Sequence, residues 1–436
     1  MMRFIRFNRS LETIAFEACE LSIAGNAFLP SIALVPLKQH AGEPSVPVVN
    51  AGERVREGQL LARGSVPGSV HVHAPVPGIL KEFTVVPLPD GTMGKAALIQ
   101  LSGSFDIMGR KAANFPWNIV SESALLLILE DSRVINTFSK PEPLVPALRQ
   151  AKKKGSAILA IRLFDGDPTV QLDSILADKM IDTVLEGTAL IAKALDATSV
   201  YLIHNGKKWN RKGSGELESL FQKRKVYIIH SRNRYPSGYS DCINQLLRSV
   251  NPACRDTQPI IIDPVTAISA FEAVVRNQPV LNRTIVVTGP SLGRPEILKV
   301  KIGTPIGDII EECGGFKTAP GRIVVNGLLT GTAVYDLDMP VTKYTKSIHI
   351  MDSDTCPEYT THPCIHCGRC LQVCPVKIDP MRVVIGITKG KHTPLLMRSL
   401  ESCQFCGCCA IVCPSRIPLH QIMHEARERL TKGDKR

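Results

Sequence analysis

The sequence has no long hydrophobic run. Its longest, residues 124–129 (ALLLIL), is far below the ~18 residues that a membrane-spanning helix needs, so we expect no direct membrane span. At this length the run is compatible with a buried strand. The first residues, MMRFIR, lack the hydrophobic region of a secretory signal peptide. This predicts a chain in the reducing cytosol, either soluble or held at a membrane through partners.

Acidic residues are in the minority, and the formal net charge is +12. The denser basic stretches are residues 152–154, residues 207–212 and the C-terminal tail. They are either ordinary solvated surface or a docking site for an acidic partner, such as a ferredoxin or flavodoxin, or for anionic lipid. No motif supports nucleic-acid binding, so we expect none.

Eight of the 14 cysteines form two copies of the pattern C-x2-C-x2-C-x3-C-P. The pattern is typical of bacterial two-cluster ferredoxins, in which the fourth cysteine of each copy binds the cluster of the other copy. The sequence therefore predicts two [4Fe–4S] clusters and one-electron transfer. The first cluster is assigned Cys364, Cys367, Cys370 and Cys413, and the second is assigned Cys403, Cys406, Cys409 and Cys374.

Zinc and disulfides explain this pattern less well. Zinc sites use paired C-x2-C units and do not need three evenly spaced cysteines followed by C-P. Disulfides are disfavoured in a reducing compartment. Cys408 adjoins the expected ligand Cys409, so ligand identity there depends on spacing alone, and Cys356 and His366 are expected to be bystanders. Helical apolar spacing at residues 380–387, 394–400 and 419–430 predicts a mostly helical cluster domain.

The remaining segments predict three further modules. Residues 35–101 are short apolar runs separated by glycine and proline, and they resemble a biotinyl/lipoyl-type barrel, but residues 62–73 contain no lysine for a swinging arm. A helix at 180–195 and buried strands at 200–203, 226–229 and 260–262 predict an α/β domain, with residues 207–225 as a surface excursion. Strands at 284–288, 297–302 and 322–325, with a helix that Thr304 caps and that ends near Cys313, predict a β-grasp.

In this order the modules resemble the RnfC subunit of Rnf complexes, which are membrane-bound ferredoxin:NAD oxidoreductases that pump Na⁺ or H⁺. The resemblance is carried by the doubled cysteine motif and by residues 36–44 (PLKQHAGEP), 235–238 (YPSG), 286–289 (VVTG), 302–305 (IGTP) and 338–343 (DMPVTK). It implies a peripheral electron-transfer subunit on the cytoplasmic face of the inner membrane, with Rnf membrane subunits as partners. The implied fold class is multidomain α+β.

The resemblance also implies domain boundaries. We expect a barrel-sandwich module at 1–104, an α/β domain resembling an FMN/NADH-binding domain at 105–282, a β-grasp (SLBB-like) domain with its connector at 283–350, and a helical two-cluster ferredoxin domain at 351–436.

The chain departs from the family at the glycine-rich loop that holds FMN and admits NADH. Its counterpart here is residues 109–117 (GRKAANFPW), of which Gly109, Arg110, Lys111, Phe115 and Pro116 are the candidate cofactor-binding residues. Glycines let backbone N–H groups approach a phosphate, whereas Arg110 and Lys111 place side chains there. The acidic and cysteine pattern of a second flavin-lining element is also missing at residues 129–134. These departures count against retained FMN and NAD(H) binding.

Three functions remain open from the sequence. The chain is either an RnfC-like electron-transfer subunit, a soluble iron–sulfur flavoprotein resembling cobalamin reductase, or a non-catalytic scaffold held together by its clusters. No catalytic residue is predicted, because the clusters themselves would carry the electrons.

Overall fold

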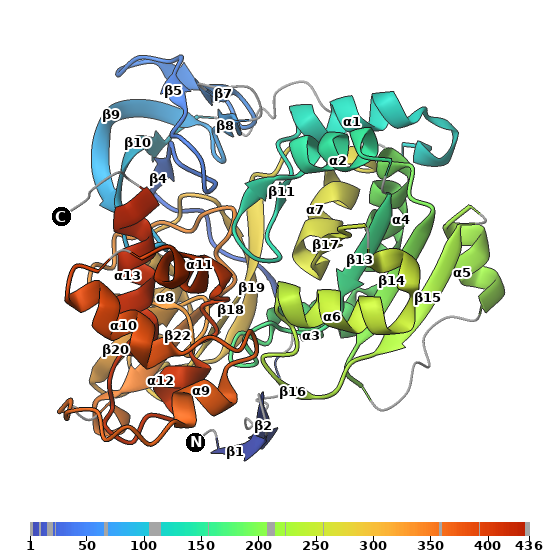
Figure 1. Cartoon of the computed structure of the whole chain (residues 1–436). Helices are drawn as coiled ribbons and strands as arrows, with labels where there is room; N and C mark the ends of the chain where they lie inside the picture. Colours follow the sequence, from blue (N-terminus) through green and yellow to red (C-terminus); the bar gives the residue numbers. More distant parts are fainter. Residues whose placement is uncertain are drawn as a thin grey trace.

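The computed structural model describes residues 3–7, 10–14, 21, 23–64, 69–103, 115–155, 157–206, 214–222, 224–255, 257–356, 360–391 and 393–431. In Figure 1 the N-terminal barrel lies at the upper left, above the β-grasp, the α/β domain lies at the right, and the C-terminal helices lie in front of the β-grasp. No helix in the described ranges is long and apolar enough to span a membrane.

The barrel consists of two small antiparallel sheets around one apolar core. Val35, Leu61, Leu80 and Ile99 are completely buried in this core. Gly78 is required where two strands meet, because a Cβ there would lie 2.2 Å from the carbonyl oxygen of Gln100. The sheets have the orders β4-β10-β9-β6 and β5-β7-β8, with β4 (Ile32–Pro36), β5 (Val46–Pro47), β6 (Arg54–Val55), β7 (Leu60–Arg63), β8 (Val72–His73), β9 (Gly78–Pro87) and β10 (Met93–Leu101).

The α/β domain is built on a four-stranded parallel sheet of order β15-β14-β13-β17. Its strands are β13 (Ile158–Arg162), β14 (Ser199–His204), β15 (Lys225–His230) and β17 (Ile260–Ile262). One face packs on helices α1 (Glu122–Asp131), α2 (Leu144–Lys153), α4 (Ile181–Leu195) and α7 (Pro264–Val274), and the other on α6 (Ser240–Val250). The domain also contains α3 (Leu172–Lys179), α5 (Ser214–Leu220), a two-stranded β11 (Ile135–Asn136) and β12 (Glu142–Pro143) sheet, and 3-10 turns at Trp117–Ile119 and Pro252–Cys254.

Two sequence expectations in this domain are wrong. The apolar run at 124–129 is not a strand: it lies within α1, where the Ser121 side chain caps the helix by accepting from the N–H of Ala124. Leu125 and Leu129 of this run are buried four residues apart on one helix face. The expected surface excursion at 207–225 contains α5, whose Leu217 is buried in the main core.

The β-grasp sheet has six strands in the order β21-β20-β22-β18-β19-β3. They are β18 (Asn282–Thr288), β19 (Glu296–Lys301), β20 (Pro320–Val325), β21 (Thr332–Val334), β22 (Ser347–Asp352) and β3 (Ile23–Asn26), with α8 (Ile306–Glu312) packed on the sheet. Strand β3 pairs in parallel with β19, so this part of the N-terminal segment extends the β-grasp sheet and not the barrel. Thr304 does not cap α8: its hydroxyl has no hydrogen-bond partner, and the N-cap residue is Pro305.

The C-terminal domain is mostly helical, as predicted. Its helices are α9 (Arg369–Val373), α10 (Pro380–Thr388), α11 (Pro394–Ser402), α12 (Cys408–Ile411) and α13 (Leu419–Thr431), after a 3-10 turn at Ser353–Thr355. Asp379 and Thr393 cap α10 and α11, and each of these helices has proline in its first turn. A small three-stranded sheet of β1 (Arg3–Phe7), β2 (Ser10–Ile14) and β16 (Arg234–Tyr235) lies near this domain in Figure 1.

Candidate metal centres

The two cysteine motifs adopt the same local backbone. The residue two positions after the first cysteine has positive φ in each copy, 53° at His366 and 51° at Phe405, and its N–H donates to the preceding cysteine sulfur at 3.4 Å. Gly368 and Gly407 then adopt φ of 70° and 72° and cap α9 and α12. Glycine suits these left-handed positions because it has no Cβ. Each motif therefore wraps its first three cysteines around one point.

Cys364, Cys367, Cys370 and Cys413 line one cavity of about 320 Å³. The first three come from the loop and first turn of α9, and Cys413 follows α12. Gly368 also lines this cavity, and a Cβ on it would meet no other atom within 4 Å. The structure thus brings together the four residues that the spacing assigned to the first cluster, and their chemistry fits an iron–sulfur cluster.

Cys374, Cys403, Cys406 and Cys409 line a second cavity, together with Cys408. The space between these side chains is only about 20 Å³, so a cluster there requires the thiols to turn outward from the positions seen. Among the described side chains, no three His, Cys, Asp or Glu groups converge on a single metal-ion position. A cubane instead spreads its four thiolates over four iron corners.

Burial favours the protonated form of three of the four thiols in the second group in the absence of metal. It raises the pKa of Cys403 to about 12, and it also raises the pKa values of Cys374 and Cys409. A hydrogen bond from the Cys408 thiol instead lowers the pKa of Cys406. Because iron binds thiolates, loading this site would release protons.

The α/β domain covers the second group. The Tyr235 hydroxyl donates to the carbonyl oxygen of Cys406, and the Ser240 hydroxyl donates to the side-chain oxygen of Gln404 at 2.7 Å. Tyr235, Cys406 and Cys408 share one small apolar cluster with Val373. By contrast, Cys367 of the first group is exposed, and its neighbour Ile365 is 67% exposed. The two groups therefore lie in different environments.

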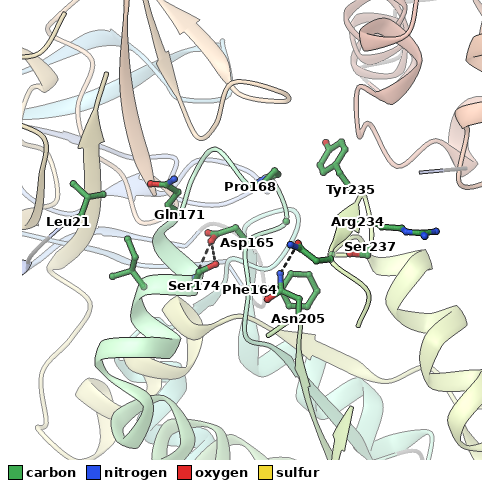
Figure 2. A pocket seen from close by; sticks show the side chains of 14 residues that line it. Leu21, Phe164, Asp165, Pro168, Gln171, Ser174, Asn205, Arg234, Tyr235 and Ser237 are labelled. Atoms are coloured by element: carbon green, nitrogen blue, oxygen red, sulfur yellow. Dashed lines mark hydrogen bonds between the residues drawn. The ribbon is translucent and has the colours of Figure 1, made fainter. Parts of the chain in front are cut away.

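Tyr235 also lines a third cavity, of about 310 Å³, at the end of strands β13 and β14 (Figure 2). Asp165 lies on its wall and accepts hydrogen bonds from the backbone N–H of Asp173 and from Ser174. Burial raises the pKa of Asp165 to about 7. Asn205 and Asn233 complete part of the polar lining, where the Asn205 amide donates to the Asn233 side chain at 3.4 Å.

Phe115 and Pro116, which belong to the described part of the predicted flavin loop, do not line this cavity. Gly109, Arg110 and Lys111 lie outside the described residues. The N–H of Phe115 donates to the carbonyl oxygen of Val275, and Pro116 precedes a turn whose Trp117 side chain donates to Glu186 of α4. Phe115 and Trp117 therefore pack on the helical side of the α/β domain, whereas Pro116 is exposed. The described residues do not provide the backbone cradle that a flavin phosphate requires, so we derive no flavin site.

Two contacts at the second group were not anticipated from the sequence. Cys408 lines the second cavity beside the four expected ligands, although the motif spacing assigns the ligand role to Cys409. The segment 235–238 was a family signature without an assigned role, and its tyrosine proves to hold the second cysteine loop. Nothing in the local sequence indicates a partner 171 residues away.

Three segments of the chain match models of known domain families. The chain matches the RnfC barrel sandwich hybrid domain over residues 18–104, the SLBB domain over 284–333 and the 4Fe-4S dicluster domain over 363–417. The predicted multidomain α+β fold class is confirmed by these three domains in this order. The chain accordingly carries an iron–sulfur domain.

Its relatives include the RnfC-type subunits of several ion-translocating complexes. The one from the proton-translocating ferredoxin:NAD(+) oxidoreductase complex of Clostridium ljungdahlii is 26% identical over 82% of this chain and 79% of its own length. The one from the ion-translocating oxidoreductase complex of Rhodobacter capsulatus is 27% identical over 83% of this chain and 71% of that protein. The corresponding Pseudomonas aeruginosa protein is 29% identical over 92% of this chain and 53% of its own length. The chain is a homologue of RnfC subunits.

Proposed function

We propose that this RnfC homologue is the electron-transfer subunit of an Rnf-type ion-translocating oxidoreductase, peripheral on the cytoplasmic face of the membrane. Its partners are then the other Rnf subunits, with a ferredoxin or flavodoxin as the soluble partner. The proposal is supported by relatives that are named as subunits of ferredoxin:NAD(+) oxidoreductase complexes in Clostridium ljungdahlii and Acetobacterium woodii.

The single observation that carries the proposal is the interleaving of the two cysteine motifs. Three cysteines of each copy share a cavity with the fourth cysteine of the other copy. We assign one [4Fe–4S] cluster to Cys364, Cys367, Cys370 and Cys413, and a second to Cys374, Cys403, Cys406 and Cys409. When bound, such a cluster accepts and donates one electron at a time.

The two groups differ in their surroundings, and from this we infer different roles for them. Tyr235, Gln404 and Ser240 bury the second group and hold it against the α/β domain. The first group opens toward solvent at Cys367 and Ile365. Its cavity is lined by the exposed Arg369 and Arg382 and by one carboxylate, Asp379. This basic rim suits an acidic electron-transfer partner at the first group.

We further propose that this subunit works without an FMN of its own and does not itself oxidise or reduce NAD(H). The loop at 109–117 lacks the glycines that a phosphate cradle needs, and its Phe115 packs against the helices. A one-electron centre cannot exchange a hydride without a flavin, so NAD(H) would react at another subunit. Flavin analysis of the anaerobically purified chain tests this: bound FMN and bleaching by NADH would contradict it.

Tagging the chain in its own cells tests the complex. We expect solubilised membranes to yield the tagged chain with multi-span subunits, and alkaline washing to strip it from them. A Cys367→Ala variant should still assemble but should block ferredoxin-dependent electron flow. Recovery of the chain only from the soluble fraction, bound to a corrinoid enzyme, would instead favour the cobalamin-reductase function. Recovery with clusters that dithionite cannot reduce would indicate a scaffold.

A further inference from the structure

A group of basic side chains, most of them buried, lies where the barrel, the α/β domain and the β-grasp meet. His40 follows β4, Arg133 follows α1, Arg283 lies on β18, and Lys343 precedes β22. His40, Arg283 and Lys343 are 4%, 3% and 3% exposed. The Lys343 ammonium donates to the carbonyl oxygen of Arg133 at 3.3 Å, and its backbone N–H donates to the Gln39 side chain at 3.0 Å. Three modules thus contribute to one cationic junction.

Arg283 presents an unused pair of donors in this junction. One terminal nitrogen, Nη1, donates to the Ser269 hydroxyl at 3.2 Å. The remaining pair, Nε and Nη2, is buried and has no hydrogen-bond partner. These two nitrogens form one edge of the guanidinium, the planar fork that binds two oxygens of a carboxylate or phosphate. An arginine keeps its proton when it is buried, so its unsatisfied nitrogens bear the cost of burial in full.

Other polar atoms of the same junction are also unsatisfied. His40 Nδ1, Arg133 Nε, Ser132 Oγ and Thr304 Oγ1 are buried without a hydrogen-bond partner. Backbone hydrogen bonds tie two of these residues to neighbouring segments. The N–H of Val341 donates to the carbonyl oxygen of Thr304, and the N–H of Val280 donates to the carbonyl oxygen of Ser132. Several donors on three modules therefore lack an acceptor.

The nearby carboxylates are engaged elsewhere. Asp263 and Asp173 pair with Lys346, and Asp173 also pairs with Arg162. Glu272 pairs with Lys299 at 2.6 Å. Within the described ranges, no ion pair joins Arg283 or Lys343 to a carboxylate. Burial, with the charges of Arg283 and Arg133, lowers the pKa of Lys343 to about 7. An anion at the junction would remove this repulsion.

We propose that the junction binds a phosphate-type oxyanion, held by the Arg283 fork and by Lys343 and His40. A tetrahedral dianion fits better than a carboxylate, because its oxygens can meet donors that arrive from three modules at once. The ion would fasten the barrel, the α/β domain and the β-grasp to one another. It is either a free phosphate or the phosphate group of a nucleotide.

Purification in buffers free of phosphate and sulfate provides the first test. The full chain, with its iron–sulfur clusters, is denatured, and the released small molecules are measured by phosphate assay and mass spectrometry. We expect about one phosphate group per chain, since buried polar groups are satisfied in native proteins. A free ion and a nucleotide differ in mass, so the same measurement identifies the source.

Thermal unfolding provides the second test. If the ion is lost on purification, inorganic phosphate should raise the melting temperature in a concentration-dependent way, whereas chloride at equal ionic strength should not. Arg283→Lys keeps the charge but removes the fork, so it should abolish the phosphate effect and leave iron content unchanged. Arg322→Lys, at an exposed position of β20, is the matched control and should respond like the wild type.

The wild-type measurements do not depend on whether a variant folds. No released phosphate, together with no stabilisation beyond that of chloride, would overturn the proposal and mean that the junction holds only water. A phosphate effect that persists in Arg283→Lys would also overturn it, because the ion would then bind elsewhere.

Discussion

The two cysteine groups have the same sequence motif and the same backbone, but different surroundings. In the first group Cys367 is exposed, whereas in the second Cys406 is 8% exposed and Cys408 completely buried. The difference comes from residues far away in the chain, because Tyr235 and Ser240 of the α/β domain cover the second group. A repeated motif thus determines the ligands, and the rest of the fold determines the environment of each group.

This difference has a consequence for electron transfer. Solvent exposure and hydrogen bonds near the sulfurs set the reduction potential of an iron–sulfur cluster. A buried, covered site and an open, basic site should therefore have different potentials. We expect the open site to exchange electrons with partner proteins and the covered site to be shielded from them.

Removing one ligand from each group should have the largest effect. Cys367→Ala and Cys406→Ala should each lower the iron content from about eight to about four atoms per chain. Cys406→Ala should also lower the melting temperature more, because its loop is part of the contact with the α/β domain. Iron analysis and thermal unfolding measure both effects, and loss of all iron from either variant would contradict separate sites.

The next largest effect is expected in the rate at which each site loses its cluster in air. The open site should lose its cluster several times faster than the covered one, because oxygen and water reach Cys367 directly. Electron paramagnetic resonance of dithionite-reduced samples, taken after timed air exposure, follows each loss. The Cys367→Ala variant, which keeps only the covered site, should decay slowly, and equal decay in both single-ligand variants would refute the difference.

The contact of Tyr235 with Cys406 can be weakened without touching a ligand. Tyr235→Phe leaves the buried carbonyl of Cys406 without this donor, which costs about 1–3 kcal/mol of stability. It should also lower the potential of the covered site alone, because a donated hydrogen bond favours the extra negative charge of reduction. A redox titration measures this shift. Tyr335→Phe is the control, since Tyr335 is 92% exposed.

The smallest effect is expected at Cys408. Although it lines the second cavity, the motif spacing assigns the ligand role to Cys409. Cys408→Ala should therefore keep about eight iron atoms per chain and cost about 1 kcal/mol through lost packing. A fall to about four iron atoms would show that Cys408 is a ligand.

Much of the fold follows from local patterns. The predicted helices at 180–195, 380–387, 394–400 and 419–430 and the predicted strands at 200–203, 226–229 and 260–262 are confirmed, because apolar periodicity reports which face is buried. The strand at 226–229 is not buried as expected: β15 is an edge strand, and its Tyr227 and Ile228 are exposed. The strand prediction at 124–129 was wrong because a fully apolar stretch fits a strand and a helix equally well. The Ser121 cap favours the helix. Thr304 failed as a cap because the helix begins at Ile306, one residue later than expected, which makes Pro305 the N-cap residue.

Long-range features could not be predicted in this way. Strand β3 pairs with β19, and the partner of Ile23 is Ile297, more than two hundred residues along the chain. Likewise, nothing in the signature at 36–44 indicates that His40 lies near Lys343. The cysteine spacing did place the right four residues around each cavity, because the pattern encodes local geometry. The assignment of these residues as ligands stays a prediction.

The metal content of the anaerobically purified chain tests the two interleaved clusters most directly. Iron and acid-labile sulfide are measured together with zinc on the same sample. We predict about eight iron and about eight sulfide per chain, with no zinc, as two [4Fe–4S] clusters require. Stoichiometric zinc, or about four iron with no further gain on reconstitution, would contradict two interleaved clusters.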